Sequence, residues 1–497
     1  MLVLGTSVAS APTQSGSSTC LVMSNFANAQ YTVNMNLGSP GQTLKMIPDS
    51  GSSDLVVPSS QCKAADGCKG ACPRTRIRSA HPLSPSQAML PAGVHHSKFN
   101  PAQSSTFEGP LGKVDVTYGQ GDTECLKIKD VVQMGHLKAT AQDMLLITTN
   151  GLTGYAAAMY DGILGLGIEK LCRKNTPSIL TNLPSVDRFT LCIGNRDQEN
   201  GVLVVGDSMI NALQWPEELH FHARPIYTGN IPFWGLYMSS LEILGEKLEC
   251  EPNCAAIIDS GTSLMSLPSK MAWKVLDAIG VGFSADCSDV MGRLPDIVFT
   301  IEGTSFRMAP SDYMVVVDSD DLTEQGLIRS GSPTALSSTK HHVGPFGVKH
   351  LRPKHSAAAS QCAPAFTELD ESTNRGKMVI LGMPFLRSYA TSFDRGDGKP
   401  GSATIRFAKV DNQPGVCSTC ESALMDRTEL LSSSAFNTAN KSSAVLPRVR
   451  MSAVRLPWWA PRLAARAEGR DAEPAPSQEE RNRPAHVRWG NVLDARS

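Results

Sequence analysis

Short apolar segments with the character of β-strands run through residues 25–411. Examples are YTVNMNLG, KVDVTYG, GVLVVGD, DIVFTI and SATIRFAKV, which are rich in Val, Ile, Thr, Tyr and Phe. Gly, Pro, Asn and Ser separate them, and this combination is typical of strands joined by tight turns. The clearest helical pattern is SKMAWKVLDAIG, which follows Pro268 and has Ser269 as a candidate N-cap. We therefore expect an all-β protein with few helices.

Two copies of one motif lie in the two halves of this pattern. Asp49-Ser50-Gly51 follows the stretch KMIP, and Gly165 of the later Ile163-Leu164-Gly165 lies 116 positions after Asp49. Asp259-Ser260-Gly261 follows AAII, and Gly382 of the later Ile380-Leu381-Gly382 lies 123 positions after Asp259. Asp, Ser and Gly are poor strand residues, so each copy marks a tight turn at the end of a strand. The duplication predicts two lobes of similar plan, related by a pseudo-twofold axis.

Four segments fall outside the strand pattern. Residues 73–97 and 330–360 are rich in Ser, Pro, Ala and basic residues without periodicity, which is typical of surface insertions. Residues 1–24 have a brief apolar run without a basic flank, and we interpret them as a leader or a truncated prosegment remnant. Residues 412–497 are interpreted as a disordered, Arg-rich tail. The two lobes are therefore expected at residues 25–214 and 215–411.

The composition is that of an ordinary globular protein. Of the 497 residues, 41% are hydrophobic and 19% are charged, and the formal net charge is -1. This length allows two or three domains with sizeable cores, and the balanced charge gives no reason to expect nucleic acid as a partner. No run reaches the roughly 18 consecutive apolar residues of a transmembrane helix. Partners must therefore be inferred from particular sites.

Thirteen cysteines indicate disulfides or metal sites. Three groups are closely spaced: Cys62-x5-Cys68-x3-Cys72, Cys250-x3-Cys254 and Cys417-x2-Cys420. Each spacing fits either a short disulfide loop or a set of metal ligands. No histidine lies near them at ligand spacing, which favours disulfides and an oxidising compartment. We expect no bound metal and no cofactor, and the odd number leaves at least one thiol outside a disulfide.

The two Asp-Ser-Gly turns suggest a single catalytic site. A pseudo-twofold axis places the carboxyl groups of Asp49 and Asp259 side by side. Like charges in such contact cannot both ionise, so the pair shares one proton. The ionised carboxylate can take a proton from a bound water while the protonated one polarises a carbonyl oxygen. This chemistry predicts a hydrolase whose activity persists in the presence of chelators and of reagents that modify serine or cysteine.

Further motifs in the same order resemble the pepsin-like aspartic proteases, the family that includes cathepsin D. The resemblance spans residues 25–411. Tyr31-Thr32-Val33 is similar to the family's entry strand, and Phe99-Asn100-Pro101 to the segment before its flap. Tyr118-Gly119-Gln120-Gly121 falls at the flap itself, and Tyr160-Asp161-Gly162-Ile163 resembles the family's Phe-Asp-Gly-Ile. The resemblance implies a bilobal double β-barrel with pseudo-twofold symmetry and an active-site cleft between the lobes.

The resemblance also implies roles for individual residues. Asp49 and Asp259 correspond to the catalytic aspartates. Ser50 and Ser260 correspond to hydroxyl residues that bond between the lobes, and Ser52 supports the first loop. Substrate-binding residues are expected in the flap, the glycine turns and the pocket walls: Tyr118, Gly119, Gly51, Gly261, Thr262, Ile47 and Ile163.

Three family disulfides are expected from the same resemblance. Cys250 and Cys254 match a short pair that precedes the second Asp loop. Cys287 and Cys362 match a longer pair in the C-terminal lobe, which would enclose the 330–360 insertion. The small N-terminal loop is matched by Cys62 with Cys68 or Cys72, and we expect Cys125 to bond to whichever of the last two remains.

Three positions depart from the family pattern. Pro48 stands where Phe, Val or Leu is usual, and proline cannot donate a ladder hydrogen bond. Val56 replaces a Trp that in many members bonds the flap tyrosine, so Tyr118 needs another partner or a looser flap. Met383 replaces the Asp of the most acid-adapted members, which predicts a less extreme pH optimum.

We therefore expect an aspartic endopeptidase that hydrolyses peptide bonds between bulky apolar residues. The expected partners are protein or peptide substrates and pepstatin-type inhibitors, bound by a monomer without a transmembrane segment. The expected location is the secretory pathway, ending in an acidic lysosome-like or vacuole-like compartment or outside the cell. The alternative is a catalytically inactive pepsin-like protein that binds peptides or proteins, which Pro48 and Val56 favour.

Overall fold

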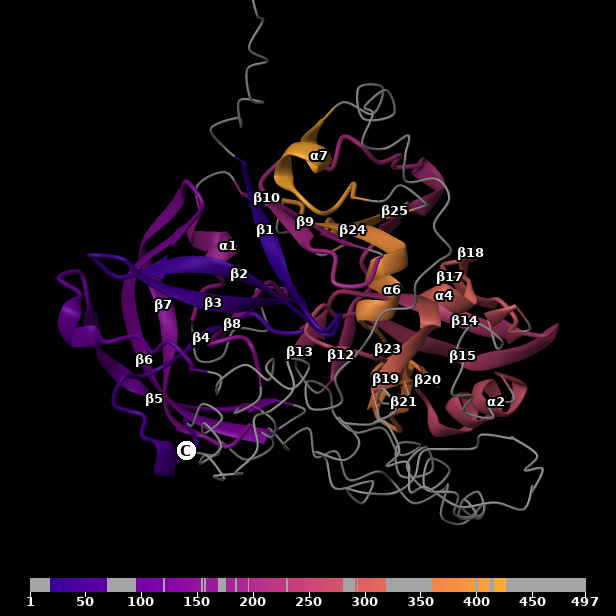
Figure 1. The fold of residues 1–497 in the computed structure, drawn as a ribbon, viewed down its shortest axis with the longest axis horizontal. Coiled ribbons are helices and arrows are strands. Elements are labelled where there is room, and N and C mark those ends of the chain that lie inside the picture. Colours follow the sequence, from indigo (N-terminus) through magenta and orange to yellow (C-terminus); the bar gives the residue numbers. More distant parts are fainter. Residues whose placement is uncertain are drawn as a thin grey trace, which may run out of the picture.

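The computed structural model describes most of the segments that carry the strand pattern. Strands predominate in it, which confirms the predicted all-β class. Figure 1 shows them in two groups, one indigo to purple from the first half of the chain and one rose to orange from the second. The predicted lobe boundaries stay predictions. The described residues are 18–68, 95–118, 121–152, 155, 158–168, 176–183, 186–194, 196–228, 231–279, 291–292, 294–318, 360–397, 401–410 and 415–425.

A 13-stranded sheet carries the first Asp-Ser-Gly loop. Strands β5 and β6 at its edge form the hairpin predicted as a flap, and residues 119–120 between them lie outside the described residues. Strands from the end of the chain lie at the opposite edge, so the sheet joins both halves of the molecule. Its order is β11 (His220–His222), β25 (Thr404–Lys409), β24 (Tyr389–Asp394), β9 (Arg188–Ile193), β10 (Gly201–Val205), β1 (Thr19–Phe26), β2 (Gln30–Leu37), β3 (Gln42–Asp49), β8 (Gly162–Gly165), β4 (Leu55–Pro58), β7 (Leu137–Asn150), β6 (Gly121–Met134) and β5 (Glu108–Tyr118).

An eight-stranded sheet carries the second loop. Its order is β18 (Thr304–Met308), β17 (Ile297–Ile301), β14 (Gly235–Ile243), β15 (Glu246–Ile258), β23 (Gly376–Leu381), β16 (Met265–Leu267) and β21 (Phe366–Glu368), with β22 (Ser372–Thr373) paired to β23. Two small antiparallel pairs complete the strands: β12 (Ile226–Thr228) with β13 (Ile231–Phe233), and β19 (Met314–Asp318) with β20 (Ser360–Pro364).

The described helices are short and connect or cover the strands. The longest matches the predicted helix, but it begins at Ser269 itself, whose N–H group donates to Asp370 Oδ1 at 3.0 Å. Asp370 therefore caps this helix from outside it. The helices are α1 (Ile179–Asn182), α2 (Ser269–Ile279), α4 (Pro310–Tyr313), α6 (Met383–Ser388) and α7 (Cys420–Leu424), with 3-10 turns η1 (Ala64–Asp66), η3 (Pro101–Gln103) and η7 (Glu217–Leu219).

The duplicated motif forms the same strand arrangement in both sheets. β3 pairs in parallel with β8 and aligns Asp49 with Gly165. β15 pairs in parallel with β23 and aligns Ile258 with Leu381, one position before Asp259. After each loop a short strand, β4 or β16, turns back antiparallel to β8 or β23. Each aspartate therefore lies at the end of a central strand, at the same place in its sheet.

Aromatic packing joins the two sheets beneath the loops. Trp234 is fully buried, its ring nitrogen donates to the carbonyl of Leu166 at 3.0 Å, and its own carbonyl accepts the N–H of Ile258 at 2.9 Å. Phe189 and Phe393 stack on each other with ring centroids 4.6 Å apart, and both rings also contact Trp234. This cluster ties the strand that leads to Asp259 to the larger sheet.

Two unpredicted disulfides join the C-terminal segment of the described chain to strands of the larger sheet. Cys20 of β1 bonds to Cys420 of α7, and Cys192 of β9 bonds to Cys417. The close spacing of Cys417 and Cys420 predicted a short disulfide loop or a metal site, and this prediction is wrong because each cysteine bonds to a different strand. Figure 1 shows α7 (yellow-orange) beside β10 and β1. Residues 415–425 therefore belong to the fold rather than to the predicted tail, and β1 begins inside the predicted leader.

The structure forms two of the disulfides implied by the resemblance. Cys250 bonds to Cys254 before the second loop, and Cys62 bonds to Cys68. The expected bonds from Cys287 to Cys362 and from Cys125 to Cys72 lie outside the described residues, as do most of the 73–97 insertion and nearly all of the 330–360 one.

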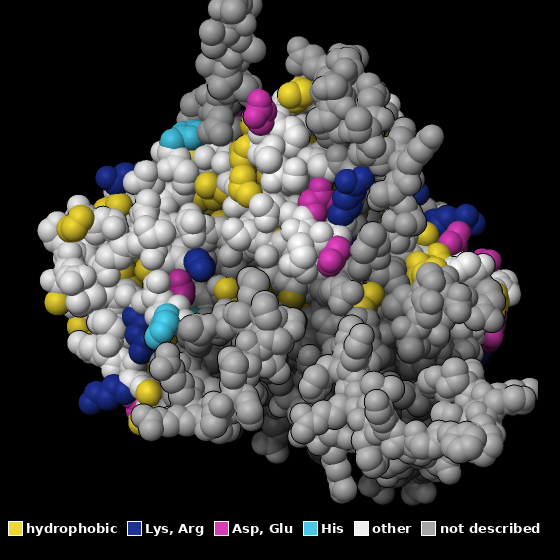
Figure 2. All heavy atoms as spheres, in the orientation of Figure 1, with side chains coloured by type: hydrophobic (Ala, Val, Ile, Leu, Met, Phe, Trp, Pro, Cys, Tyr) yellow, Lys and Arg dark blue, Asp and Glu magenta, His cyan; other side chains and the backbone are white. Residues whose placement is uncertain are grey.

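The surface gives no single-sign charged region on the face drawn in Figure 2, where Lys, Arg, Asp and Glu side chains of the described residues are interspersed. The large hydrophobic side chains exposed among the described residues are scattered: Val22, Leu111 and Leu244. No helix among the described residues is long and apolar enough to cross a membrane.

Candidate active site

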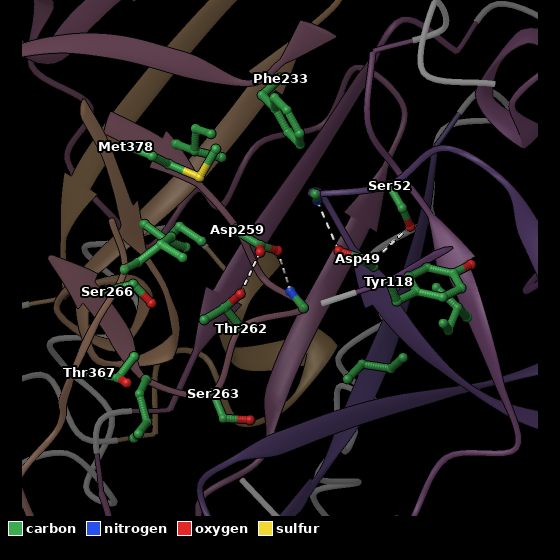
Figure 3. Close-up of a pocket in the computed structure, with 18 of the residues that line it drawn as sticks. Asp49, Ser52, Tyr118, Phe233, Asp259, Thr262, Ser263, Ser266, Thr367 and Met378 are labelled. Carbon is green, nitrogen blue, oxygen red and sulfur yellow. Dashed lines mark hydrogen bonds between the residues drawn. The ribbon is translucent and has the colours of Figure 1, made fainter. Parts of the chain in front are cut away.

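The two aspartates face each other from the ends of β3 and β15 (Figure 3). Their side chains are largely buried, with Asp49 9% and Asp259 8% exposed. The backbone carbonyl of Asp49 accepts the N–H of Leu166 at 2.8 Å, and the N–H of Asp259 donates to Leu381 at 3.2 Å. These strand-to-strand bonds fix both aspartates relative to the sheets.

Each carboxyl group accepts the same two hydrogen bonds from its own loop. The N–H two residues later donates to Oδ1, and the hydroxyl three residues later donates to Oδ2, as the dashed lines in Figure 3 show. Hydrogen bonds to the carboxylate favour its ionised form and fix its orientation. The donors are Gly51 (2.9 Å) and Ser52 (2.5 Å) for Asp49, and Gly261 (2.8 Å) and Thr262 (2.5 Å) for Asp259.

Reciprocal hydrogen bonds between the loops lie beneath the carboxyl groups. The N–H of Ser50 donates to Ser260 Oγ at 3.0 Å, and the N–H of Ser260 donates to Ser50 Oγ at 2.9 Å. Each hydroxyl then donates across the lobes, from Ser50 to the carbonyl of Ile258 and from Ser260 to the carbonyl of Pro48, both at 2.9 Å. All four buried groups are therefore satisfied, and the two loops form one rigid unit.

The glycine of each loop lies against the carboxyl group of the other. A Cβ atom on Gly51 would lie 2.7 Å from Asp259 Oδ1, and one on Gly261 would lie 2.4 Å from Asp49 Oδ1. Real Cβ atoms do not approach oxygen this closely, so only glycine fits at either position. The close approach places both carboxyl groups at one site.

The electrostatics of the site keep a proton on the pair. Burial and then the charge of Asp259 together raise the pKa of Asp49 from its ordinary value of 3.8 to about 7, although hydrogen bonds from Ser52 and Gly51 oppose the shift. Desolvation disfavours the charged form, and a second negative charge nearby disfavours it again. Asp49 therefore holds its proton through the acidic range, as a proton-sharing pair requires.

A cavity of about 220 Å³ opens over the two carboxyl groups. The sequence-predicted residues Ile47, Gly51, Ser52, Tyr118, Ile163, Gly261 and Thr262 all line it. Gly119 lies outside the described residues. Ser50 and Ser260 do not reach the cavity and instead support the loops from below.

The cavity wall on the Asp49 side was predicted from the sequence, but its counterpart on the Asp259 side was not. Ile257 and Ile380 line the cavity, and they align in β15 and β23 just as Ile47 and Ile163 align in β3 and β8. The duplication itself could have identified them. Phe233 and Met378 also line the cavity, on the Asp259 side in Figure 3, and no repeated motif marks either residue.

The predicted flap tyrosine lies at the end of β5 on the Asp49 side of the cavity (Figure 3). Its ring packs against a cluster that includes Ile47, Val56 and Ile163. Val56 is fully buried there and has no polar side-chain atom, so it supports the Tyr118 ring by apolar packing alone.

Pro48 is accommodated because of its place in β3. The pairing of β3 with β2 ends at Met46, so Pro48 has a paired strand, β8, on one side. A proline at such a position leaves no donor unsatisfied on the other side. Its carbonyl remains available and accepts the bond from Ser260. The proline therefore does not disrupt the first loop.

No group of three or more His, Cys, Asp or Glu side chains in the described ranges is placed to hold a metal ion. The polar groups at the cavity are instead two carboxyl groups and the two hydroxyl and two backbone N–H groups that donate hydrogen bonds to them. This arrangement can bind and polarise a water molecule between the carboxyl groups.

Comparisons with known proteins agree with this geometry. A model of the eukaryotic aspartyl protease family matches residues 30–332, more than half of the chain. Pepsin A of Rhinolophus ferrumequinum and that of Sus scrofa are each 27% identical over 394 residues, 77% of this chain and 83% of either pepsin. Pepsin II-2/3 of Oryctolagus cuniculus is 26% identical over 392 residues, 77% of this chain and 82% of that protein. The chain therefore belongs to the eukaryotic aspartyl proteases and is an aspartic endopeptidase with the all-β, bilobal pepsin-like fold.

Proposed function

We propose that Asp49 and Asp259 are the catalytic pair of this endopeptidase. The observation that carries the proposal is the matched donor set on the two carboxyl groups, combined with the contact of each with the other loop's glycine. Two carboxyl groups so close act as one titrating unit with a single proton over a range of pH.

The pair would act by general acid and base catalysis. One ionised carboxylate takes a proton from a water held between the pair, and the water oxygen attacks the carbonyl carbon of the peptide bond. The protonated carboxyl group donates to the carbonyl oxygen, which gives a tetrahedral gem-diol. Protonation of the leaving nitrogen and return of a proton to the pair then break the C–N bond. No covalent enzyme intermediate forms.

The cavity lining favours substrates with bulky apolar residues on both sides of the cleaved bond. Ile47, Tyr118 and Ile163 provide an apolar wall on the Asp49 side. Ile257, Ile380 and other apolar side chains provide one on the Asp259 side. Burial of apolar side chains contributes about 25 cal/mol per Å². An extended peptide could bond to the flap and to the glycine turns as an added strand.

The remaining expectations follow from this mechanism. A transition-state mimic such as a pepstatin-type inhibitor should bind between the carboxyl groups. A catalytic pair that needs one shared proton suits an acidic compartment of the secretory pathway. The disulfides suit an oxidising compartment. We propose that the enzyme acts as a monomer, with lobes at residues 25–214 and 215–411.

Two single substitutions test the catalytic assignment. Asp49→Ala and Asp259→Ala should each abolish cleavage of a denatured protein substrate at about pH 4, where the dyad is expected to share one proton. Wild-type activity should be blocked by pepstatin and should persist with a chelator. Substantial activity in either variant would overturn the assignment.

The alternative of an inactive binding protein has no specific observation in its favour. Both carboxyl groups accept hydrogen bonds from their loops, Tyr118 lines the cavity, and Pro48 is accommodated in β3. A folded wild-type protein that cleaves no peptide would nevertheless support the alternative.

A further inference from the structure

A buried histidine lies behind the cleft wall, outside the catalytic pair. The side chain of His96 is 1% exposed, and its Nδ1 lies 3.7 Å from Oδ1 of Asp161, whose side chain is 4% exposed. The imidazole ring stacks on Tyr155 with centroids 4.2 Å apart. Its Nε2 lies 2.9 Å from the backbone carbonyl oxygen of Tyr155. Neither His96 nor Tyr155 has a role in the mechanism above.

The contacts of the two ring nitrogens determine which protonation state fits. A carbonyl oxygen only accepts hydrogen bonds, so Nε2 of His96 must carry hydrogen and donate. In the neutral ring Nδ1 would then present a lone pair to the Asp161 carboxylate, and the buried Nδ1 has no hydrogen-bond partner among the described residues. A proton on Nδ1 converts this contact into an attractive one. The geometry therefore favours the positively charged ring.

The surroundings of Asp161 point to the same pairing. Its Oδ1 accepts the N–H of Ser97 and its Oδ2 accepts the N–H of Lys45, both at 2.8 Å. Such bonds stabilise the ionised carboxylate, and a buried carboxylate needs a cation. The ammonium group of Lys98 instead donates to the Cys62 carbonyl, at 2.6 Å.

The side chain of Lys45 is exposed on β3. Tyr155 and Tyr160 are the other titratable groups that face the cluster, and burial raises both of their pKa values, that of Tyr160 to about 12, so both stay neutral. Among the described residues, His96 is therefore the cation placed to pair with Asp161.

The pair connects directly to the substrate wall. Asp161 lies between Tyr160 and the first residues of β8, and Tyr160 and Ile163 both line the cavity. The hydroxyl of Tyr155 donates to the carbonyl of Asp161 at 2.8 Å, and its ring meets Tyr160 edge to face at 6.0 Å. A shift of Asp161 would therefore displace two residues that line the cavity.

On the basis of the proposed function, we propose that His96 is a positioning residue whose protonated ring pairs with Asp161 and holds Tyr160 and Ile163 in the cleft wall. Loss of the Nδ1 proton would remove this pairing, loosen the wall and weaken substrate binding.

Steady-state kinetics on a peptide with bulky apolar residues at the cleaved bond test the proposal. His96→Gln keeps a donor for the Tyr155 carbonyl but removes the charge, and His96→Asn places an uncharged donor near Asp161. Both should raise KM about tenfold at about pH 5, the change that corresponds to about 1.4 kcal/mol. Wild-type KM should rise toward these values as pH rises, because only the protonated ring can pair with Asp161.

The control is His95→Gln, because His95 is the exposed neighbour of His96. It should leave KM and its pH dependence unchanged, and kcat should change less than about twofold in every variant. Wild-type KM and pH dependence in both His96 variants would overturn the proposal. So would an effect confined to kcat, which would place His96 with the catalytic pair.

A stability measurement separates this inference from the proposed function. The melting temperature of His96→Gln should lie below that of the wild type in acid, and the difference should shrink as pH rises, because only the protonated ring can pair with Asp161. A difference that is constant across pH would contradict the ion pair. This measurement needs no catalysis, so it tests the pairing of His96 with Asp161 even if the protein cleaves no peptide.

Discussion

At the scale of a single residue, the raised pKa of Asp49 makes the stability of the fold depend on pH. In the unfolded chain this carboxyl group ionises near its ordinary value of 3.8, and in the folded protein burial and the charge of Asp259 raise its pKa to about 7. A raised carboxyl pKa means that the unfolded state releases its proton first. Folding is therefore progressively disfavoured as pH rises from about 4 to about 7.

Asp49→Asn removes this pH-dependent cost, because an amide cannot ionise. The variant should have a melting temperature close to that of the wild type near pH 3 and a higher one near pH 7, while losing activity. Calorimetry across this pH range measures the difference. A difference that does not grow with pH would show that Asp49 is not held protonated by burial and by Asp259.

At the scale of the elements, the two loops are joined by the hydroxyl groups of Ser50 and Ser260. Each hydroxyl accepts a buried N–H from the other loop and donates to a buried carbonyl. Removal of one hydroxyl leaves a buried N–H and a buried carbonyl without a partner, and each such group costs about 1–3 kcal/mol. The symmetry of the bonds predicts similar losses on the two sides.

Ser50→Ala should therefore lower the free energy of unfolding by about 1–3 kcal/mol and reduce kcat, because the carboxyl groups lose their fixed separation. Ser50→Thr keeps the hydroxyl and serves as the matched control, with a smaller loss. Urea unfolding and kcat would be measured for both. Equal effects of Ala and Thr would show that side-chain volume, and not the hydroxyl, determines the outcome.

The duplicated motif accounts for what the sequence could predict at this scale. Apolar residues before each Asp-Ser-Gly turn, and a later Ile-Leu-Gly, are local signals, so the paired loops follow from them. The wall of Ile47 and Ile163 was predicted from the family resemblance. The same reasoning should have yielded Ile257 and Ile380 from the second copy. Phe233 reaches the cavity through the small β12–β13 hairpin, whose place depends on tertiary packing that no local pattern encodes.

At the scale of the whole molecule, two disulfides hold the C-terminal segment against the larger sheet. The bonds Cys20–Cys420 and Cys192–Cys417 join residues 400 and 225 positions apart. Sequence spacing favoured a bond between Cys417 and Cys420, which are close in the chain, because it contains no information on contacts between distant segments. Ala423 and Val416 pack in the same apolar cluster as Val202 and Val204 of β10.

The double variant Cys20→Ser/Cys420→Ser should lower the free energy of unfolding by about 2–5 kcal/mol, since a long disulfide loop restricts the unfolded chain. Cys250→Ser/Cys254→Ser opens a loop of only four positions and should cost less. Chemical unfolding under oxidising conditions compares the two. A larger loss from the short loop would contradict this entropic account.

Asp49 and Asp259 are proposed to act as one proton-sharing unit. The most direct measurement is kcat/KM for Asp49→Ala, Asp259→Ala and the double variant on the same peptide near pH 4. Groups that act as a unit lose their function together, so each single variant should fall by at least about 1,000-fold and the double variant no further. Losses that multiply in the double variant, or a single variant that retains activity close to wild type, would contradict the claim.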